Sequence, residues 1–222
     1  MQTLGSTLGR KLLMALTGLF LILFLTIHLI GNLKLLMSDN GTAFNEYAHF
    51  MAHNELIQIV SIGNFFFILL HIVVSIMLTL HNQSARPVQY ASASKTKGSP
   101  AARQMMLLGT LVLIFIVVHL VNFWGKAKFG IGGGVPMKGS LPDLYSVTKA
   151  AFTELWLVAL YVFSMIALSF HLSHGFQSAF QTIGLNHKKY TPFIKTLGLL
   201  YSIIVPFLFG LIPVLLHIWS LK

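Results

Sequence analysis

The stretch Ala167–Phe180, which reads ALSFHLSHGFQSAF, places His171 and His174 inside an otherwise apolar run. Ionisable side chains within a segment long enough to cross a membrane are costly, and they are usually functional. Three other apolar segments carry a histidine at a comparable position, and these histidines are His28, His71 and His119. We therefore predict a fold that brings four apolar helices together around four imidazoles.

The composition is that of an integral membrane protein. Of the 222 residues, 55% are hydrophobic and 9% are charged, which is far from the balance of a soluble domain. The net charge of +10 does not indicate a nucleic-acid-binding protein, because the 15 lysines and arginines lie between apolar runs rather than in one patch. The chain has no cysteine, so disulfides and thiolate metal sites are excluded and histidine is the obvious ligand for a transition metal.

Five segments are long enough to cross a bilayer, which takes about 20 apolar residues. They are Lys11–Leu36, Leu56–Leu80, Met105–Trp124, Leu155–Phe176 and Ile194–Trp219. We expect one all-α transmembrane domain over residues 1–222, with a four-helix bundle built from the four helices that carry the histidines. The fifth helix has no central histidine and is expected to pack against this bundle. The segment Phe129–Pro142 is rich in glycine and proline and is expected to lack regular structure.

The distribution of charge predicts a cytoplasmic N-terminus and an outer C-terminus. In this orientation nine lysines and arginines lie on the cytoplasmic side and six lie outside, as the positive-inside rule favours. All five acidic residues then lie on the outer side, and they are Asp39, Glu46, Glu55, Asp143 and Glu154. The polar loop Asn82–Pro100 would be cytoplasmic, either as a contact surface or as a solvated loop.

The four histidines lie at matched distances from the ends of their helices. Each follows the charged residue at the start of its segment by 16 or 17 residues. This offset corresponds to about 24–26 Å along a helix. Because successive helices alternate in direction, His28 and His119 are predicted near the outer face, and His71 and His171 near the inner face.

Two histidines at each of two depths are what two bis-histidine haems require. Each iron takes one imidazole nitrogen from either side of the porphyrin, and the second ring nitrogen needs an acceptor that fixes the tautomer. We predict that His28 and His119 ligate the iron of an outer haem, and that His71 and His171 ligate the iron of an inner haem.

Small residues near three of the four ligands would leave room for a porphyrin. They are Gly31, Ser75 and Gly175, three or four residues after His28, His71 and His171. Phe123 stands at the corresponding offset from His119, so the pattern is incomplete. His174, nearly one turn from His171, remains a second choice as ligand of the inner haem or a partner for one of its propionates.

Two haem-free alternatives remain open. A single histidine within the membrane can be a structural residue bonded to a neighbouring helix, although four at matched positions are harder to explain in this way. A transporter can also use histidines for proton transfer, but it would normally place acidic residues within the membrane. Here all five acidic residues lie at or beyond the ends of the apolar segments.

Several stretches of the chain are similar to those of one known family. They are Gly9–Gly18 leading into His28–Asn32, His71 followed by Arg86–Tyr90, His119–Trp124, and His171–Ser178. In their order and spacing the chain resembles the five-helix, di-haem cytochrome b subunit of bacterial and archaeal succinate dehydrogenases and fumarate reductases. The resemblance covers nearly the whole chain and is weakest from Gly125 to Ala150.

The resemblance implies an electron-transfer subunit of the prokaryotic cytoplasmic membrane. Such a subunit anchors a flavoprotein and an iron–sulfur protein, and it connects the iron–sulfur clusters with a membrane quinone, menaquinone in some members, through two b-type haems. The reaction of succinate or fumarate takes place in the flavoprotein. In relatives an acidic residue at the outer start of the second helix exchanges protons with the quinol, and Glu46 and Glu55 are the candidates here. The alternative identities are a cytochrome b subunit of a hydrogenase or formate dehydrogenase and a haem-free membrane transporter.

Overall fold

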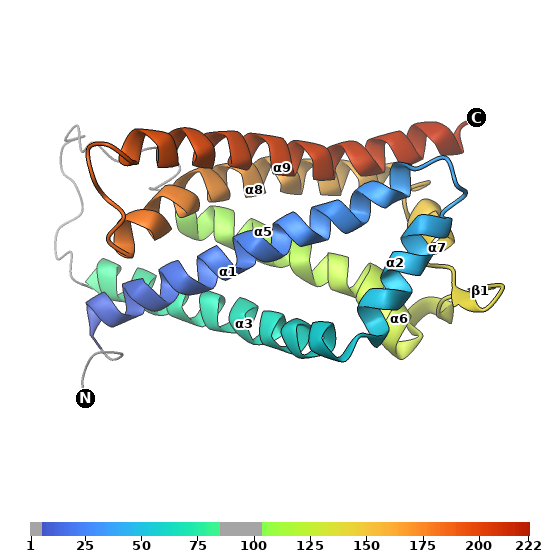
Figure 1. Ribbon diagram of the computed structural model, residues 1–222, viewed down its shortest axis with the longest axis horizontal. Coiled ribbons are helices and arrows are strands. Elements are labelled where there is room, and N and C mark those ends of the chain that lie inside the picture. The colour runs from blue at the N-terminus through green and yellow to red at the C-terminus, as the bar shows by residue number, and fades with distance from the viewer. Residues whose placement is uncertain (1–5, 85–103) are drawn as a thin grey trace.

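The computed structural model is all-α, with long helices that lie lengthwise beside one another (Figure 1). It describes residues 6–84 and 104–222. Five of the described helices are long and apolar enough to cross a membrane. They are α1 (Thr7–Leu33), α3 (Glu55–Ser84), α5 (Met105–His119) with its continuation to Phe129, α8 (Leu155–Thr182) and α9 (Thr191–Ser220).

The five predicted segments coincide with these helices, and the differences lie at their ends. α1 begins at Thr7, four residues before the predicted start, because the Oγ of Ser6 accepts a hydrogen bond of 3.1 Å from the Gly9 N–H and caps the helix. α8 continues to Thr182, six residues beyond the predicted end. Polar residues can extend a helix beyond its apolar core, so hydropathy alone does not mark where a helix ends.

The outward surface of the long helices is apolar. Large side chains stand exposed along it, for example Ile62 on α3 at 71%, Phe163 on α8 at 56% and Phe207 on α9 at 64%. Exposing such a surface to water would cost about 25 cal/mol for each Å². Contiguous apolar surface of this kind is suited to lipid, in agreement with the composition.

The interior is built mainly where α8, α9 and α1 meet. α8 and α9 pack along one another, α1 packs against α3, α8 and α9, and α5 packs against α8. Leu157 on α8, Leu216 on α9 and Leu29 on α1 belong to one buried cluster. α9 remains a single helix through Pro206 and Pro213, both of which are fully buried against its neighbours.

Short elements gather at one end of the bundle, on the right in Figure 1. They are η1 (Lys34–Leu36), α2 (Thr42–His53), α6 (Lys126–Phe129), η3 (Ile131–Gly133), β1 (Met137–Lys138), β2 (Leu141–Pro142) and α7 (Leu144–Ala151). The segment Phe129–Pro142 is therefore not wholly irregular, since β1 and β2 pair antiparallel within it. Hydropathy did not predict α2 and α7, because both are too short to cross a membrane.

Hydrogen bonds from one buried side chain join α2 to α7. The Asn45 side chain, only 3% exposed, donates to the Asp143 carboxylate at 2.8 Å and accepts from the Tyr145 N–H at 2.9 Å. Although desolvation raises it, the pKa of Asp143 lies below its usual value because Asn45 and Ser146 donate hydrogen bonds to the carboxylate. The ionised carboxylate caps α7, and α2 is thereby held across the end of the bundle.

Candidate functional site

The structure brings the four central histidines together in two pairs. The imidazole centres of His28 on α1 and His119 on α5 lie 5.8 Å apart, with the ring planes at 90°. Those of His71 on α3 and His171 on α8 lie 6.5 Å apart, with the planes at 65°. An iron held about 2 Å from one nitrogen of each ring would separate the two ring centres by about 6 Å. Both pairs are close to this spacing. Each pair consists of the two histidines that the sequence predicts at the same depth.

The two pairs lie at different levels of the bundle. Thr17 on α1 contacts His71, and His28 follows Thr17 by 11 residues on the same helix. At 1.5 Å per residue, the levels are about 16 Å apart along α1. The His71–His171 pair is therefore nearer the N-terminal end of α1, and the His28–His119 pair is nearer the end that carries α2.

A hydrogen bond to Thr17 fixes the tautomer of His71. The Thr17 hydroxyl donates its one proton to the backbone carbonyls of Leu13 and Met14, at 2.8 and 3.1 Å. Its oxygen lies 2.9 Å from Nδ1 of His71, so Nδ1–H is the donor in that bond. The Nε2 of His71 then carries the free lone pair that a metal requires.

The other pair is surrounded by aromatic side chains from several helices. The Tyr161 hydroxyl on α8 is 3.1 Å from Nδ1 of His119 and occupies the position that Thr17 has beside His71. Phe24 stacks on His28 with the ring centres 5.3 Å apart, and Phe209 of α9 lies 5.7 Å from the same imidazole. α9 therefore contributes to the surroundings of His28 in addition to its packing role. Apart from the Tyr161 hydroxyl, these contacts give His28 and His119 largely apolar surroundings.

Three buried polar atoms in the described part of the chain have no hydrogen-bond partner, and two of them belong to the histidine pairs or their immediate surroundings. Nδ1 of His171 is one, and Nδ2 of Asn122, three residues after His119, is another. The third is Oδ1 of Asn64 on α3. Asn122 belongs to η2 (Leu120–Gly125), a π-helical stretch, and such stretches are frequent at functional sites. Buried polar groups normally have partners, so the unpartnered Nδ1 of His171 fits a polar ligand bound there, whereas the Asn122 side chain interacts with the Tyr161 hydroxyl.

Three glycines lie near the His71–His171 pair, two of them on facing helices and one on the helix of His171 itself. A Cβ on Gly18 of α1 would be 3.5 Å from Cε1 of His71, and a Cβ on Gly109 of α5 would be 3.6 Å from Cε1 of His171. Around Gly175, no heavy atom other than its own helix backbone and chain neighbours lies within 4 Å of where a Cβ would be. These three glycines leave room around His71 and His171 for a large planar group.

Gly31 does not have the role predicted for it. A Cβ at this position would overlap the ring of Tyr47 on α2, so the glycine allows Tyr47 to approach α1 closely. Counting along the helix from His28 placed Gly31 near the ligand but could not show which face it occupies against a neighbouring helix. The prediction that Gly31 makes room for a porphyrin is corrected accordingly.

Sequence reasoning missed Thr17, Tyr161, Gly18 and Gly109. Each belongs to a helix that faces the histidine, so no offset along the histidine's own helix could identify it. The one available signal was a polar residue inside an apolar span, which applies to Thr17 and also to Asn122.

His171, rather than His174, supplies the imidazole that lies opposite His71. His174 is partly buried on the same helix, and its predicted role as a partner for a propionate stays a prediction. Arg86–Tyr90, which contributes to the family resemblance, lies outside the described residues. The predicted loop Asn82–Pro100 begins within α3, which ends at Ser84, and residues 85–100 of this loop lie outside the described residues.

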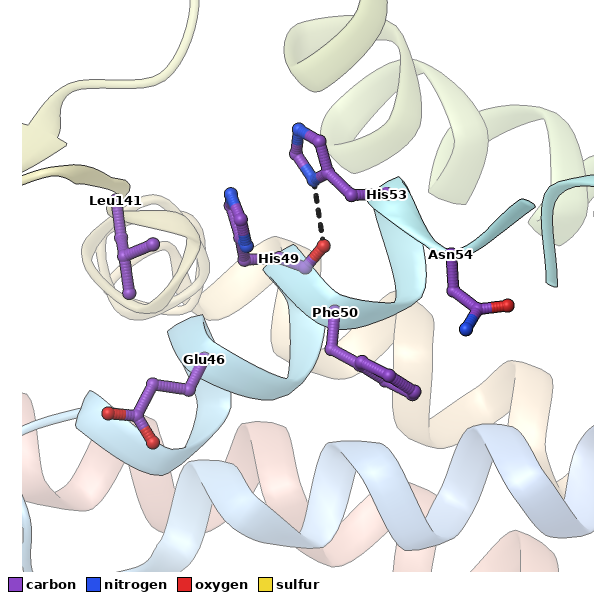
Figure 2. Close-up of a pocket in the computed structure, with 6 residues that line it drawn as sticks. All are labelled: Glu46, His49, Phe50, His53, Asn54 and Leu141. Carbon is purple, nitrogen blue, oxygen red and sulfur yellow. Dashed lines mark hydrogen bonds between the residues drawn. The ribbon is translucent and has the colours of Figure 1, made fainter. Parts of the chain in front are cut away.

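Of the two acidic candidates, Glu46 lies in a cleft. The open cleft has a volume of about 490 Å³, and Figure 2 shows the residues that line it. They are Glu46, His49, Phe50, His53, Asn54 and Leu141. The rings of His49 and His53 stack with their centres 4.0 Å apart, and Nδ1 of His53 donates to the His49 carbonyl at 2.8 Å. Glu55 begins α3 and does not line this cleft.

No group of three or more histidine, cysteine or acidic side chains in residues 6–84 and 104–222 could hold a metal ion. A haem needs only two protein ligands, because the porphyrin supplies four nitrogens, so the histidine pairs fit a haem better than a bare ion. Comparisons with protein-family models, with curated proteins and with solved structures found no match to this chain.

Proposed function

We propose that this chain is the di-haem membrane subunit of a prokaryotic succinate:quinone oxidoreductase, which connects an iron–sulfur subunit with a membrane quinone. The proposal rests on one observation: four apolar helices bring four histidines together as two pairs, with ring separations of 5.8 and 6.5 Å. His28 and His119 would hold the outer haem, and His71 and His171 the inner haem. A haem in each position supplies a one-electron couple within the membrane.

The residues around the pairs have distinct roles in this proposal. Thr17 accepts from His71 and would leave its Nε2 free to bind the iron, and the Tyr161 hydroxyl lies at the corresponding position beside Nδ1 of His119. The positive-inside rule places the His71–His171 pair on the cytoplasmic side, where the iron–sulfur and flavoprotein subunits would bind. The catalytic chemistry of succinate or fumarate belongs to the flavoprotein and not to this chain.

Glu46 is proposed as the proton-exchanging carboxylate of the quinone site, with menaquinone as the quinone. Conversion between quinone and quinol moves two protons with two electrons, so a carboxylate that exchanges with solvent is needed beside the headgroup. The open cleft around Glu46 allows this exchange, and His49 and His53 line the same cleft. Glu55 is the weaker candidate because it does not line the cleft.

Reduced-minus-oxidised absorbance spectra of the purified chain test the haem assignment. We expect b-type bands and two haems per chain. The absence of b-type bands would contradict the haem proposal and favour a haem-free transporter, and one haem per chain would contradict the two-pair arrangement. Copurification with a flavoprotein and an iron–sulfur protein that oxidise succinate is expected, whereas copurification with a hydrogenase or formate dehydrogenase would contradict the named complex.

We expect Glu46→Gln to reduce quinone-linked turnover of the assembled complex by about 100-fold, the lower end of the range typical of an acid–base group. Glu55→Gln and the matched control Glu154→Gln are expected to change turnover by less than about twofold, because neither lines the cleft. Turnover is measured with a soluble menaquinol analogue, and haem content is measured in parallel. An equal loss in Glu46→Gln and Glu55→Gln, at unchanged haem content, would contradict the assignment.

A further inference from the structure

A second cleft, of about 380 Å³, opens at the same end of the bundle. α2 forms one wall, and α6, the glycine-rich segment after it, the β-hairpin and the start of α7 form the rest. The cationic and potentially cationic side chains that line it are Lys126, Lys128, His49 and His53. No acidic side chain lines the cleft, although all five acids of the chain lie in the described residues.

The two lysines of this cleft are free to pair with a ligand. Within the described part of the chain, neither Lys126 nor Lys128 has a carboxylate or hydrogen-bond partner. Lys138, by contrast, donates to the backbone carbonyl of Asn40 at 2.6 Å. The Lys126 side chain runs over Gly132, where a Cβ would lie 3.4 Å from Cε and 4.0 Å from Nζ. The positive φ of 69° at Gly132 favours glycine and keeps this approach open.

The cleft lies where the apolar span Met105–Phe129 ends. Trp124 and Phe129 meet edge to face beside it, with their ring centres 5.1 Å apart, and tryptophan is enriched at the level of lipid headgroups. The cleft also has an apolar wall, which includes Ala48, Val135 and Leu144. A cationic part and an apolar part therefore meet at the edge of the membrane.

We infer that this cleft binds the phosphate group of an anionic phospholipid. A phosphodiester offers only acceptor oxygens, which match the two lysine ammonium groups and the imidazole N–H of His49, since the N–H of His53 already donates to the His49 carbonyl. The attached acyl chains would continue along the exposed apolar surface of the span, where Val121 is 48% exposed. The inference requires only that this span crosses a membrane, so it does not depend on either haem.

Quenching of Trp124 fluorescence by lipids with brominated acyl chains tests the site. The chain has three tryptophans, and Trp156→Phe with Trp219→Phe leaves Trp124 as the only reporter. The full-length chain is placed in nanodiscs of unbrominated phosphatidylcholine that contain increasing fractions of brominated phosphatidylglycerol or brominated phosphatidylcholine. We expect half-maximal quenching at an about tenfold lower fraction of the phosphatidylglycerol, because cationic side chains at the membrane surface attract anionic lipids.

Two double variants with the same change of charge separate the cleft from a general effect of charge. Lys126→Gln with Lys128→Gln is expected to abolish the preference for phosphatidylglycerol. Lys149→Gln with Lys222→Gln, which removes two exposed lysines outside the cleft, is expected to retain it. Lys126→Arg with Lys128→Arg keeps the charge and is expected to retain the preference. This result would show that the glutamine variant loses the preference because it loses charge and not because it misfolds.

Several outcomes would overturn the inference. They are equal quenching by the two lipids, loss of the preference in the Lys149 and Lys222 control, and its retention in the glutamine variant of Lys126 and Lys128. If millimolar inorganic phosphate abolished the preference at constant ionic strength, the cleft would be a site for free phosphate and not for a lipid. Haem content is expected to be the same in all these variants, so failure of this inference would leave the proposed function untouched.

Discussion

His28→Ala or His119→Ala is expected to remove the outer haem alone, and His71→Ala or His171→Ala is expected to remove the inner haem alone. Loss of one imidazole leaves an iron with a single protein ligand, which weakens its binding to the chain. The two pairs lie at levels about 16 Å apart along α1, so loss of one haem should not disturb the ligands of the other. Haem content should fall from two per chain to one, and a redox titration should lose one of its two waves.

The identity of the lost wave tests the pairing itself. Variants of His28 and His119 should lose the same wave, and variants of His71 and His171 should lose the other. If His28→Ala and His71→Ala removed the same wave, the pairing would be wrong.

Two further histidines serve as controls for this experiment. His217→Ala should retain both haems, because Nδ1 of His217 donates to the Phe152 carbonyl at 2.9 Å and the residue belongs to neither pair. His174→Ala should also retain both, because His171 supplies the ring opposite His71. Loss of the inner haem from His174→Ala but not from His171→Ala would reverse this choice of ligand.

The long helices and the positions of the paired histidines could be predicted because both depend on distance along one helix. A span needs about 20 apolar residues, and a ligand offset is a count of residues at 1.5 Å each. Alternating helix direction then converts equal offsets into two levels. These steps use no information about which helices touch one another.

The surroundings of the histidines could not be predicted in the same way, because they depend on contacts between helices. Thr17 reaches His71 across 54 residues of sequence, and Tyr161 reaches His119 across 42. Gly31 was predicted to make room for a porphyrin because of its offset from His28, but it contacts Tyr47 instead. Rotation of each helix about its axis decides these contacts, and nearly uniform apolar spans such as α5 carry little signal for that rotation.

Gly109→Leu is expected to prevent binding of the inner haem while leaving the outer haem in place. A Cβ at Gly109 would lie 3.6 Å from Cε1 of His171, which is ordinary van der Waals contact, so Gly109→Ala should retain both haems. The longer leucine side chain would extend beside the imidazole into the space that a porphyrin needs. Added bulk in a packed interior is accommodated only by displacement of its neighbours.

The matched control is Gly63→Leu on α3. Gly63 is also a glycine within a membrane-spanning helix, but a Cβ there would have no contact within 4 Å, so both haems should remain. The outer haem reports whether the Gly109→Leu chain is folded, because general misfolding would remove both haems together. Haem stoichiometry and the redox titration therefore distinguish these outcomes. Loss of the inner wave alone supports a porphyrin beside Gly109 and His171, whereas retention of both waves or loss of the outer wave alone would contradict it.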